Sequence, residues 1–171
     1  MENKKLLEEI RSYWNNRADG YSRVNQEELH SEQKEKWKEV LLEQLPKKEK
    51  DQVQILDIGT GPGFFAILLA EEGYQVTAVD YTEQMLQEAK SNAADLADQI
   101  SFKRMDAQNL EFPKETFDYI VTRNVTWNLE HPKRAYREWQ RVLKPGGKIL
   151  NFDANWYAYL YDDKLKLGYE Q

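Results

Sequence analysis

Three glycines alternate with other residues directly after a short apolar run, in the segment Ile55-Leu56-Asp57-Ile58-Gly59-Thr60-Gly61-Pro62-Gly63-Phe64-Phe65-Ala66. Glycines at this point allow a tight turn and let a ligand approach the backbone closely. A strand that enters such a loop, followed by an apolar helix, is typical of open α/β sheets, which bind ligands at the carboxyl ends of their strands. The segment therefore constrains both the fold and the place of the site.

In the remainder of the chain, predicted strands alternate with predicted helices. Apolar runs predict strands over residues 53–57, 75–80, 100–105, 117–123 and 147–153, and helical patterns predict helices at about 63–72, 82–97 and 132–143. Nearly continuous apolar strands that alternate with helices indicate a parallel sheet covered on both faces. We expect residues 51–171 to form a doubly wound, Rossmann-like α/β core.

Residues 1–50 have a different, helical pattern. Leu6, Leu7, Ile10, Tyr13 and Trp14 fall on one face of a helix. The pattern breaks over residues 15–20, and a second helix is expected from about 27 to 45, before a charged linker at 47–51. We expect this N-terminal helical unit to belong with the core in a single domain, because 171 residues is an ordinary size for one domain.

Charge and composition exclude several classes of function. The chain has 24 Lys and Arg against 30 Asp and Glu, a net charge of −6, which makes it a poor binder of nucleic acid or anionic membranes. It has no cysteine and only two histidines, so we expect no metal site. No run approaches the ~20 apolar residues of a membrane span, and the first residues lack a signal-peptide core. We expect a cytoplasmic protein.

The glycine loop alone leaves two nucleotide cofactors open. Gly61 to Ala66 satisfies the dinucleotide pattern G-x-G-x-x-A, and Asp80 stands where an acid would hold ribose hydroxyls. Asp57 argues against NAD, because a carboxylate would repel the pyrophosphate by ~1 kcal/mol at 4 Å in water, and by more when partly buried. The same carboxylate would attract a sulfonium or an ammonium, so Asp57 favours a cationic nucleoside.

Five segments in order resemble the motifs of class I S-adenosylmethionine-dependent methyltransferases. The first motif of this family reads acid-x-G-x-G-x-G, and Asp57, Gly59, Gly61 and Gly63 match it position for position. The other segments are Val76–Asp80, Met105–Ala107, Phe117–Val121 and Arg141–Gly147. The resemblance is greatest to methyltransferases of small molecules.

The resemblance implies a sheet of strand order 3-2-1-4-5, an N-terminal helical lid over 1–50, and S-adenosylmethionine as cofactor with S-adenosylhomocysteine as product. It implies that Asp80 holds the ribose, Asp106 the adenine amino group, and Tyr21, or otherwise Tyr13, the methionine carboxylate. Both tyrosines could instead only pack the helix onto the sheet, and Met85 could be core. The expected cofactor-binding residues are Tyr13, Tyr21, Asp57, Gly59, Thr60, Gly61, Gly63, Asp80, Tyr81, Met85, Asp106, Ala107 and Asn124.

Two departures from the family bear on catalysis. Trp127 and Asn128 stand where many relatives carry a histidine pair, so no catalytic base is identified. The family usually adds a sixth and a seventh strand, for which we expect no room here. We therefore expect strand five to form an edge that self-associates, or the tail to fold back over it as a helix.

The sequence thus predicts methyl transfer to a small acceptor by in-line displacement. The acceptor is expected to be partly apolar or aromatic because of Tyr13, Trp14, Tyr21, Trp127 and Trp156. Its identity, and whether N, O, C or S is methylated, stay open. The alternatives are a cofactor-binding fragment or a non-catalytic module that binds S-adenosylmethionine and, less favoured, an NAD-dependent oxidoreductase.

Overall fold

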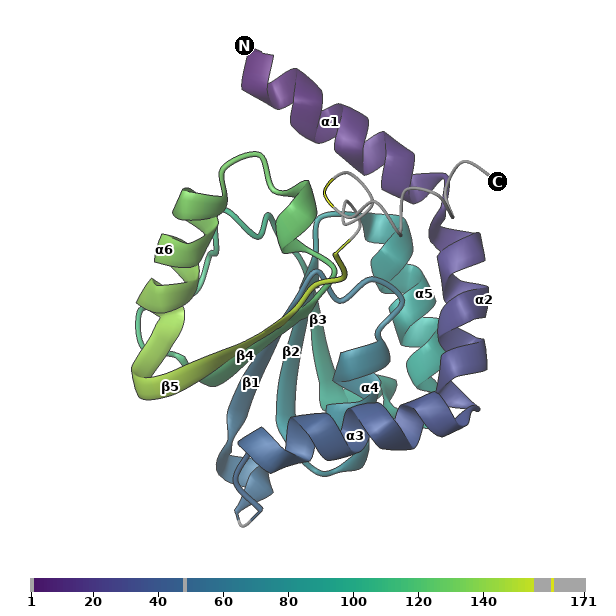
Figure 1. The fold of residues 1–171 in the computed structure, drawn as a ribbon, viewed down its shortest axis with the longest axis vertical. Helices are drawn as coiled ribbons and strands as arrows, with labels where there is room; N and C mark the ends of the chain where they lie inside the picture. The colour runs from purple at the N-terminus through teal and green to yellow at the C-terminus, as the bar shows by residue number, and fades with distance from the viewer. Residues whose placement is uncertain (1, 48, 156–160, 162–171) are drawn as a thin grey trace.

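The fold is built on a five-stranded parallel sheet in the order β3-β2-β1-β4-β5 (Figure 1). The computed structural model describes residues 2–47, 49–155 and 161. The strands are β1 (Gln54–Ile58), β2 (Gln75–Asp80), β3 (Ile100–Arg104), β4 (Phe117–Arg123) and β5 (Leu143–Phe152). This confirms the predicted Rossmann-like class and strand order. The order reverses between β1 and β4, and such a switch point is where open α/β sheets bind ligands.

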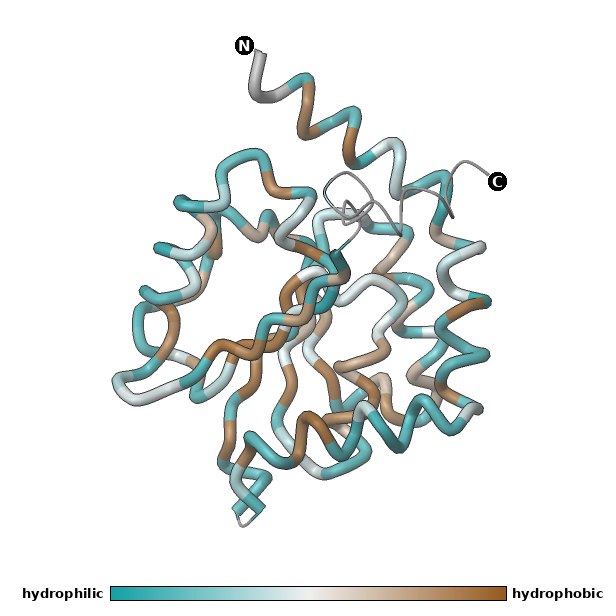
Figure 2. The backbone as a smooth tube through the Cα atoms, viewed as in Figure 1, coloured by the Kyte–Doolittle hydropathy of each residue, from teal (hydrophilic) through white to brown (hydrophobic). Residues whose placement is uncertain are grey.

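Helices cover both faces of the sheet. The helices α4 (Phe64–Glu71) and α5 (Glu83–Ala93) lie on one side, and α6 (Pro132–Val142) lies on the other (Figure 1). Neighbouring strand residues point to opposite faces, so Ile55 packs in the core under α4, whereas Leu56 packs in the core with Trp139 of α6. The strands are accordingly among the most hydrophobic parts of the backbone (Figure 2), which is typical of a sheet that is buried on both faces.

Three helices, rather than the predicted two, precede the core: α1 (Glu2–Asn15), α2 (Ala18–Leu29) and α3 (Glu32–Gln44). The prediction of one helix over 27–45 was wrong because Ser31 begins a new helix. Its hydroxyl accepts a hydrogen bond from the backbone N–H of Gln33 (3.2 Å), as an N-cap does. The predicted break over 15–20 was too long, since α2 already begins at Ala18, which is fully buried.

The last strand departs from the prediction at its start. β5 begins at Leu143, opposite Phe117, and the next paired residues are Tyr119 and Lys148. Residues 144–147 therefore bulge out of the pairing as a turn. Lys144 fixes this turn through its Nζ, which lies 2.9 Å from each oxygen of the Asp118 carboxylate.

β5 is the outermost strand on its side of the sheet within the part of the chain that the structure describes. The prediction that the tail folds over this edge, and the one that Trp156 contributes to an acceptor pocket, concern residues outside the described ranges. Among residues 2–47, 49–155 and 161, every helix is too short or too polar to cross a lipid bilayer.

Candidate functional site

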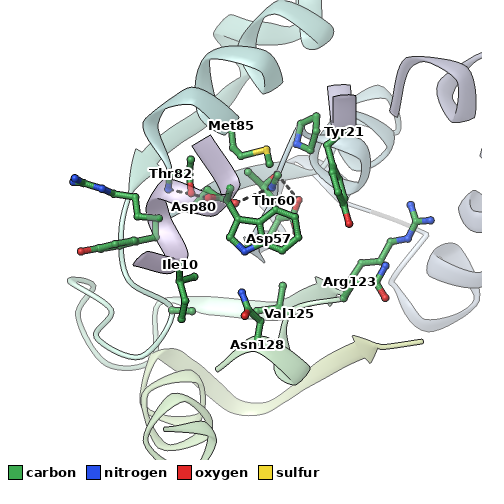
Figure 3. Close-up of a pocket in the computed structure, with 18 of the residues that line it drawn as sticks. Ile10, Tyr21, Asp57, Thr60, Asp80, Thr82, Met85, Arg123, Val125 and Asn128 are labelled. Atoms are coloured by element: carbon green, nitrogen blue, oxygen red, sulfur yellow. Dashed lines mark hydrogen bonds between the residues drawn. The ribbon is translucent and has the colours of Figure 1, made fainter. Parts of the chain in front are cut away.

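A cavity of about 540 Å³ lies at the carboxyl ends of the strands, within the range of small-molecule sites. Its walls come from the β1–α4 loop, the ends of β2, β3 and β4, and the helices α1 and α2 (Figure 3). All predicted cofactor residues line it except Tyr13 and Gly63, namely Tyr21, Asp57, Gly59, Thr60, Gly61, Asp80, Tyr81, Met85, Asp106, Ala107 and Asn124. The structure thus brings together residues from five separate segments.

The glycines of the β1–α4 loop serve different purposes. Gly61 has a φ of +52°, and a Cβ added there would meet no protein atom within 4 Å. Its backbone therefore stands open toward the cavity. Gly63 has a φ of +94°, and an added Cβ would lie 3.0 Å from the Cβ of Ala89. Gly63 thus allows the start of α4 to approach α5, which explains its place outside the cavity lining.

Asp57 is a buried carboxyl group at the end of β1, with 2% of its surface exposed. The Thr60 hydroxyl donates a hydrogen bond of 2.7 Å to its Oδ2. Burial, with a smaller contribution from the nearby Asp80 carboxylate, raises the pKa of Asp57 to about 7, although the hydrogen bonds from Thr60 and the backbone of Ala66 lower it. A cation in the cavity would stabilise the ionised form of this group.

Asp80, at the end of β2, is half-buried and is oriented by two backbone groups. Its Oδ2 accepts from the N–H of Gly61 (3.0 Å) and its Oδ1 from the N–H of Thr82 (2.9 Å). Burial raises the pKa of this carboxyl, and the backbone hydrogen bonds oppose that rise. Each oxygen can still accept a further hydrogen bond, so the group can hold two ligand hydroxyls without moving.

Asp106 follows β3 and is tied to the loop before α6. Its Oδ1 accepts from the backbone N–H (2.8 Å) and from the side-chain Nε2 (3.4 Å) of Gln108. Gln108 in turn accepts from the backbone N–H of His131 through its Oε1 (2.6 Å). A buried glutamine therefore links the Asp106 carboxylate to the residue that precedes α6.

Two further predicted residues stand beside these acids. Tyr81 carries the Arg104 guanidinium 5.5 Å from its ring centroid, and its hydroxyl donates to Glu8 of α1 (3.3 Å). The side chain of Met85, on α5, is buried. Both residues line the cavity, so Met85 belongs to the cavity wall as well as to the interior.

Asn124 holds the end of β4 in an uncommon conformation, with a φ of +57°. Its N–H donates to the carbonyl of Phe152 (2.7 Å), and its Oδ1 accepts from the N–H of Ala154 (3.1 Å). Its carbonyl accepts from the Trp127 indole (2.8 Å). The side chain of Asn124 thus holds the chain after β5, while the residue itself lies at the cavity.

The helices α1 and α2 form the outer wall. Trp14 lies edge-to-face against Tyr13 (5.1 Å), Tyr21 (5.2 Å) and Trp127 (6.3 Å). Tyr21 and Trp14 line the cavity, whereas Tyr13 and Trp127 do not. Tyr13 is 47% exposed and carries the Arg17 guanidinium over its ring. Of the two tyrosines considered for the ligand carboxylate, Tyr21 is the one that lines the cavity.

An ion pair and an amide in this wall were missed by the sequence analysis. Arg123, at the end of β4, donates two hydrogen bonds to the Glu28 carboxylate of α2 (2.9 and 2.7 Å), and its guanidinium lies over the Trp37 ring at 4.8 Å. Asn25 lies one turn before Glu28 and is buried. The spacing of Tyr21, Asn25 and Glu28, which places them on one helix face, is the signal that could have found them.

The comparison with protein families decides the assignment, because residues 56–151 match the methyltransferase domain. The chain belongs to this family. The match covers the glycine loop, Asp80, Asp106 and Asn124, and it begins after the N-terminal helices. The methyltransferase domain therefore forms the strand side of the cavity, whereas the helices α1 and α2 of the outer wall precede the residues that match the family.

Individual relatives agree with this methyltransferase assignment. The ubiquinone biosynthesis O-methyltransferase of Coxiella burnetii is 31% identical over 109 residues, which is 63% of this chain and 47% of the relative. A structure assigned as an S-adenosyl-L-methionine-dependent methyltransferase from Methanococcus maripaludis matches with a TM-score of 0.71 at 26% identity, over 82% of this chain and 64% of that one. The chain spans about half the length of the curated relatives that it matches first.

A third similar protein is described with a bound nucleoside. It is phosphoethanolamine N-methyltransferase 2 of Haemonchus contortus, in complex with phosphomonomethylethanolamine and S-adenosylhomocysteine. It matches with a TM-score of 0.59 at 28% identity, over 68% of this chain and 27% of that one.

Proposed function

We propose that this domain binds S-adenosylmethionine and transfers its methyl group to a small-molecule acceptor. The observation that carries the proposal is the buried Asp57 carboxyl beside the open glycine loop. An anionic pyrophosphate would be repelled there, whereas a cationic nucleoside would be attracted. Asp80, close by, adds a second acid to the same side of the cavity (Figure 3).

The predicted roles of the cavity residues follow from this cofactor. In our proposal, the Asp80 carboxylate accepts hydrogen bonds from the ribose hydroxyls, and Asp106 accepts from the adenine amino group. Tyr81 and Met85 flank the adenine, and the open backbone of Gly61 lies along the nucleoside. Asn124 and Tyr21 face the methionine end. The N-terminal helices, residues 1–50, act as the lid.

The chemistry asks little of the chain beyond positioning. When bound, S-adenosylmethionine supplies a methyl carbon that is already electrophilic, so no covalent intermediate with the protein is needed. The domain holds the acceptor in line with the leaving sulfur, and such positioning can supply ~7–11 kcal/mol. The apolar side chains of Leu7, Ile10 and Trp14 line the cavity and exclude water from it.

The class of acceptor is supported by the relatives and by the charge of the chain. The named relatives methylate ubiquinone precursors or phosphoethanolamine derivatives, according to their descriptions. One of them is an O-methyltransferase and the other an N-methyltransferase, so the acceptor atom stays open. A net charge of −6 disfavours a nucleic-acid acceptor. The aromatic Trp14 wall favours an acceptor that is partly apolar.

We also propose that β5 pairs with a second copy of the chain. An outermost strand presents unpaired N–H and C=O groups and invites such pairing, and β5 is ten residues long. Sedimentation at rising concentration should show a dimer. A monomer at every concentration would contradict the pairing.

A labelled-methyl assay tests the proposed activity. The protein is incubated with S-adenosylmethionine carrying an isotopic methyl label and with a mixture of small metabolites, and label is measured in the small-molecule fraction. We expect label to be transferred to a small molecule. In the Asp80→Asn variant the amount of label transferred should fall at least tenfold, because hydrogen bonds to a charged acceptor contribute ~1.5–3 kcal/mol each. Label found only on the protein, or no transfer at all, would contradict the proposal.

A further inference from the structure

Glu130 is a carboxylate in the cavity lining that has no basic partner. It lies in the loop between β4 and α6. Its side chain is 15% exposed, and the imidazole Nε2 of His131 lies 3.4 Å from its Oε1. Among residues 2–47, 49–155 and 161, no Lys or Arg forms an ion pair with it. A charge that is removed from water requires an opposite charge to compensate it, so this carboxylate suits a ligand that carries a positive charge.

The backbone on both sides of Glu130 is held by the surrounding fold. Leu129 packs against the core between the sheet and α6. The N–H of His131 donates to Oε1 of Gln108 (2.6 Å), and the carbonyl of His131 accepts from the N–H of Arg134 in the first turn of α6 (2.9 Å). A carboxylate on a fixed backbone can bind a ligand without first having to be ordered.

The segment that leads to Glu130 forms one wall of the cavity. Val125 and Asn128 of this segment lie across the cavity from Asp80 and Met85 (Figure 3). In the proposed function, Asp80 and Met85 contact the nucleoside of the cofactor. The wall that ends in Glu130 is therefore available to the acceptor.

The basic side chains of the cavity lining already have acidic partners. Arg123 donates two hydrogen bonds to Glu28, and Arg11 forms an ion pair with Glu8. Within the part of the chain that the structure describes, Arg11 and Arg123 are the basic side chains that line the cavity. An anionic acceptor would thus find no unpaired cation there, whereas a cationic acceptor would find Glu130.

We propose that Glu130 selects an amine as the methyl acceptor, by pairing with the ammonium form in which the amine binds. The inference rests on the proposed function and names the acceptor atom, nitrogen. The similar proteins include both an O-methyltransferase and an N-methyltransferase, and so leave that atom open. The ring of Trp14, which also lines the cavity, adds a surface that attracts a cation.

The charge that moves during transfer explains why a carboxylate favours an amine over an oxygen acceptor. The amine nitrogen first loses a proton to water. It then forms a bond to the methyl carbon, while the bond from that carbon to sulfur breaks and leaves its electron pair on the sulfur. The positive charge passes from sulfur to nitrogen, where a carboxylate stabilises it. The same carboxylate would repel the anionic oxygen of an ionised hydroxyl.

The test is a labelled-methyl incubation with a mixture of primary amines and, separately, with the alcohols and the carboxylic acids of the same carbon skeletons. Glu130→Gln keeps the shape of the side chain and removes its charge, whereas Glu130→Asp keeps the charge. The control is Glu111→Gln, which removes an exposed carboxylate from outside the cavity lining. S-adenosylhomocysteine is also titrated into each protein, which measures cofactor binding without an acceptor.

We expect the wild type to label amines only. Glu130→Gln should label them at least tenfold less, Glu130→Asp should retain more transfer than Glu130→Gln, and Glu111→Gln should match the wild type. All four proteins should bind S-adenosylhomocysteine within twofold of one another.

Three results would overturn the role of Glu130 while leaving the proposed function standing. These are transfer to alcohols, acids or other compounds that are not amines, amine transfer that Glu130→Gln leaves unchanged, and an equal loss of S-adenosylhomocysteine affinity in Glu130→Gln. A wild-type protein that transfers label to no small molecule at all would refute the proposed function, and the inference with it.

Discussion

Cofactor binding should weaken as the pH falls below about 7, because a cation requires Asp57 in its ionised form. Burial and the neighbouring Asp80 raise the pKa of the free Asp57 carboxyl to about 7. A bound cation stabilises the carboxylate and lowers this pKa, so binding releases a proton at pH values below 7. The affinity therefore rises with pH through about 7, where half of the Asp57 carboxyl is ionised, and levels off about one pH unit higher.

The size of the effect follows from the fraction of protein in the competent state. With a pKa of about 7, about one tenth of the Asp57 carboxyl is ionised at pH 6 and about nine tenths at pH 8. The apparent dissociation constant varies inversely with this fraction. S-adenosylmethionine should thus bind about tenfold more weakly at pH 6 than at pH 8.

Titration calorimetry at pH 6, 7 and 8 and constant ionic strength measures the effect. The matched variant is Thr60→Val, which removes the hydrogen bond that lowers the pKa of Asp57. In this variant the midpoint of the pH profile should move upward. An affinity that is the same at pH 6 and pH 8, or that is higher at pH 6, would refute the reasoning.

Two substitutions test the loop and the core. Gly61→Ala should destabilise the fold by ~1–2 kcal/mol, because an alanine is forced to a φ of +52°. It should also weaken cofactor binding, because the added Cβ points into open space at the cavity. An unchanged affinity in calorimetry would place the nucleoside elsewhere. Trp139→Ala should lower the free energy of unfolding by ~3–5 kcal/mol, because Trp139 is fully buried and its indole donates to the carbonyl of Ala107. Urea titrations measure this change, and a loss below about 1 kcal/mol would contradict the packing of Trp139.

The sheet and the cofactor side of the site could be predicted because local sequence encodes them. Both acids lie at the carboxyl ends of short apolar strands, because Asp57 is the last residue but one of β1 and Asp80 is the last residue of β2. In a parallel sheet the carboxyl ends of the strands share one edge, so these acids converge without further information. The glycines of the loop adopt positive φ angles that few other residues tolerate, so their spacing in the sequence indicates the turn after β1.

The N-terminal half of the site could not be predicted in the same way. Residues 30–36 contain no apolar side chain, so apolar spacing alone does not reveal that the Ser31 cap begins a new helix there. The ion pair between Glu28 and Arg123 joins residues 95 positions apart, and no local pattern pairs them. The Asn25 amide is buried without a hydrogen-bond partner among the described residues, which no local sequence pattern predicts.

Calorimetric titration of the wild-type chain with S-adenosylhomocysteine and, separately, with NAD tests the central claim most directly. Both ligands fit a glycine loop followed by an acid at the end of the second strand, and the charge of Asp57 disfavours the pyrophosphate of NAD. We predict saturable one-to-one binding of S-adenosylhomocysteine and no measurable binding of NAD. Binding of NAD that is tighter than that of S-adenosylhomocysteine would contradict the assignment of the cavity as a methyltransferase cofactor site.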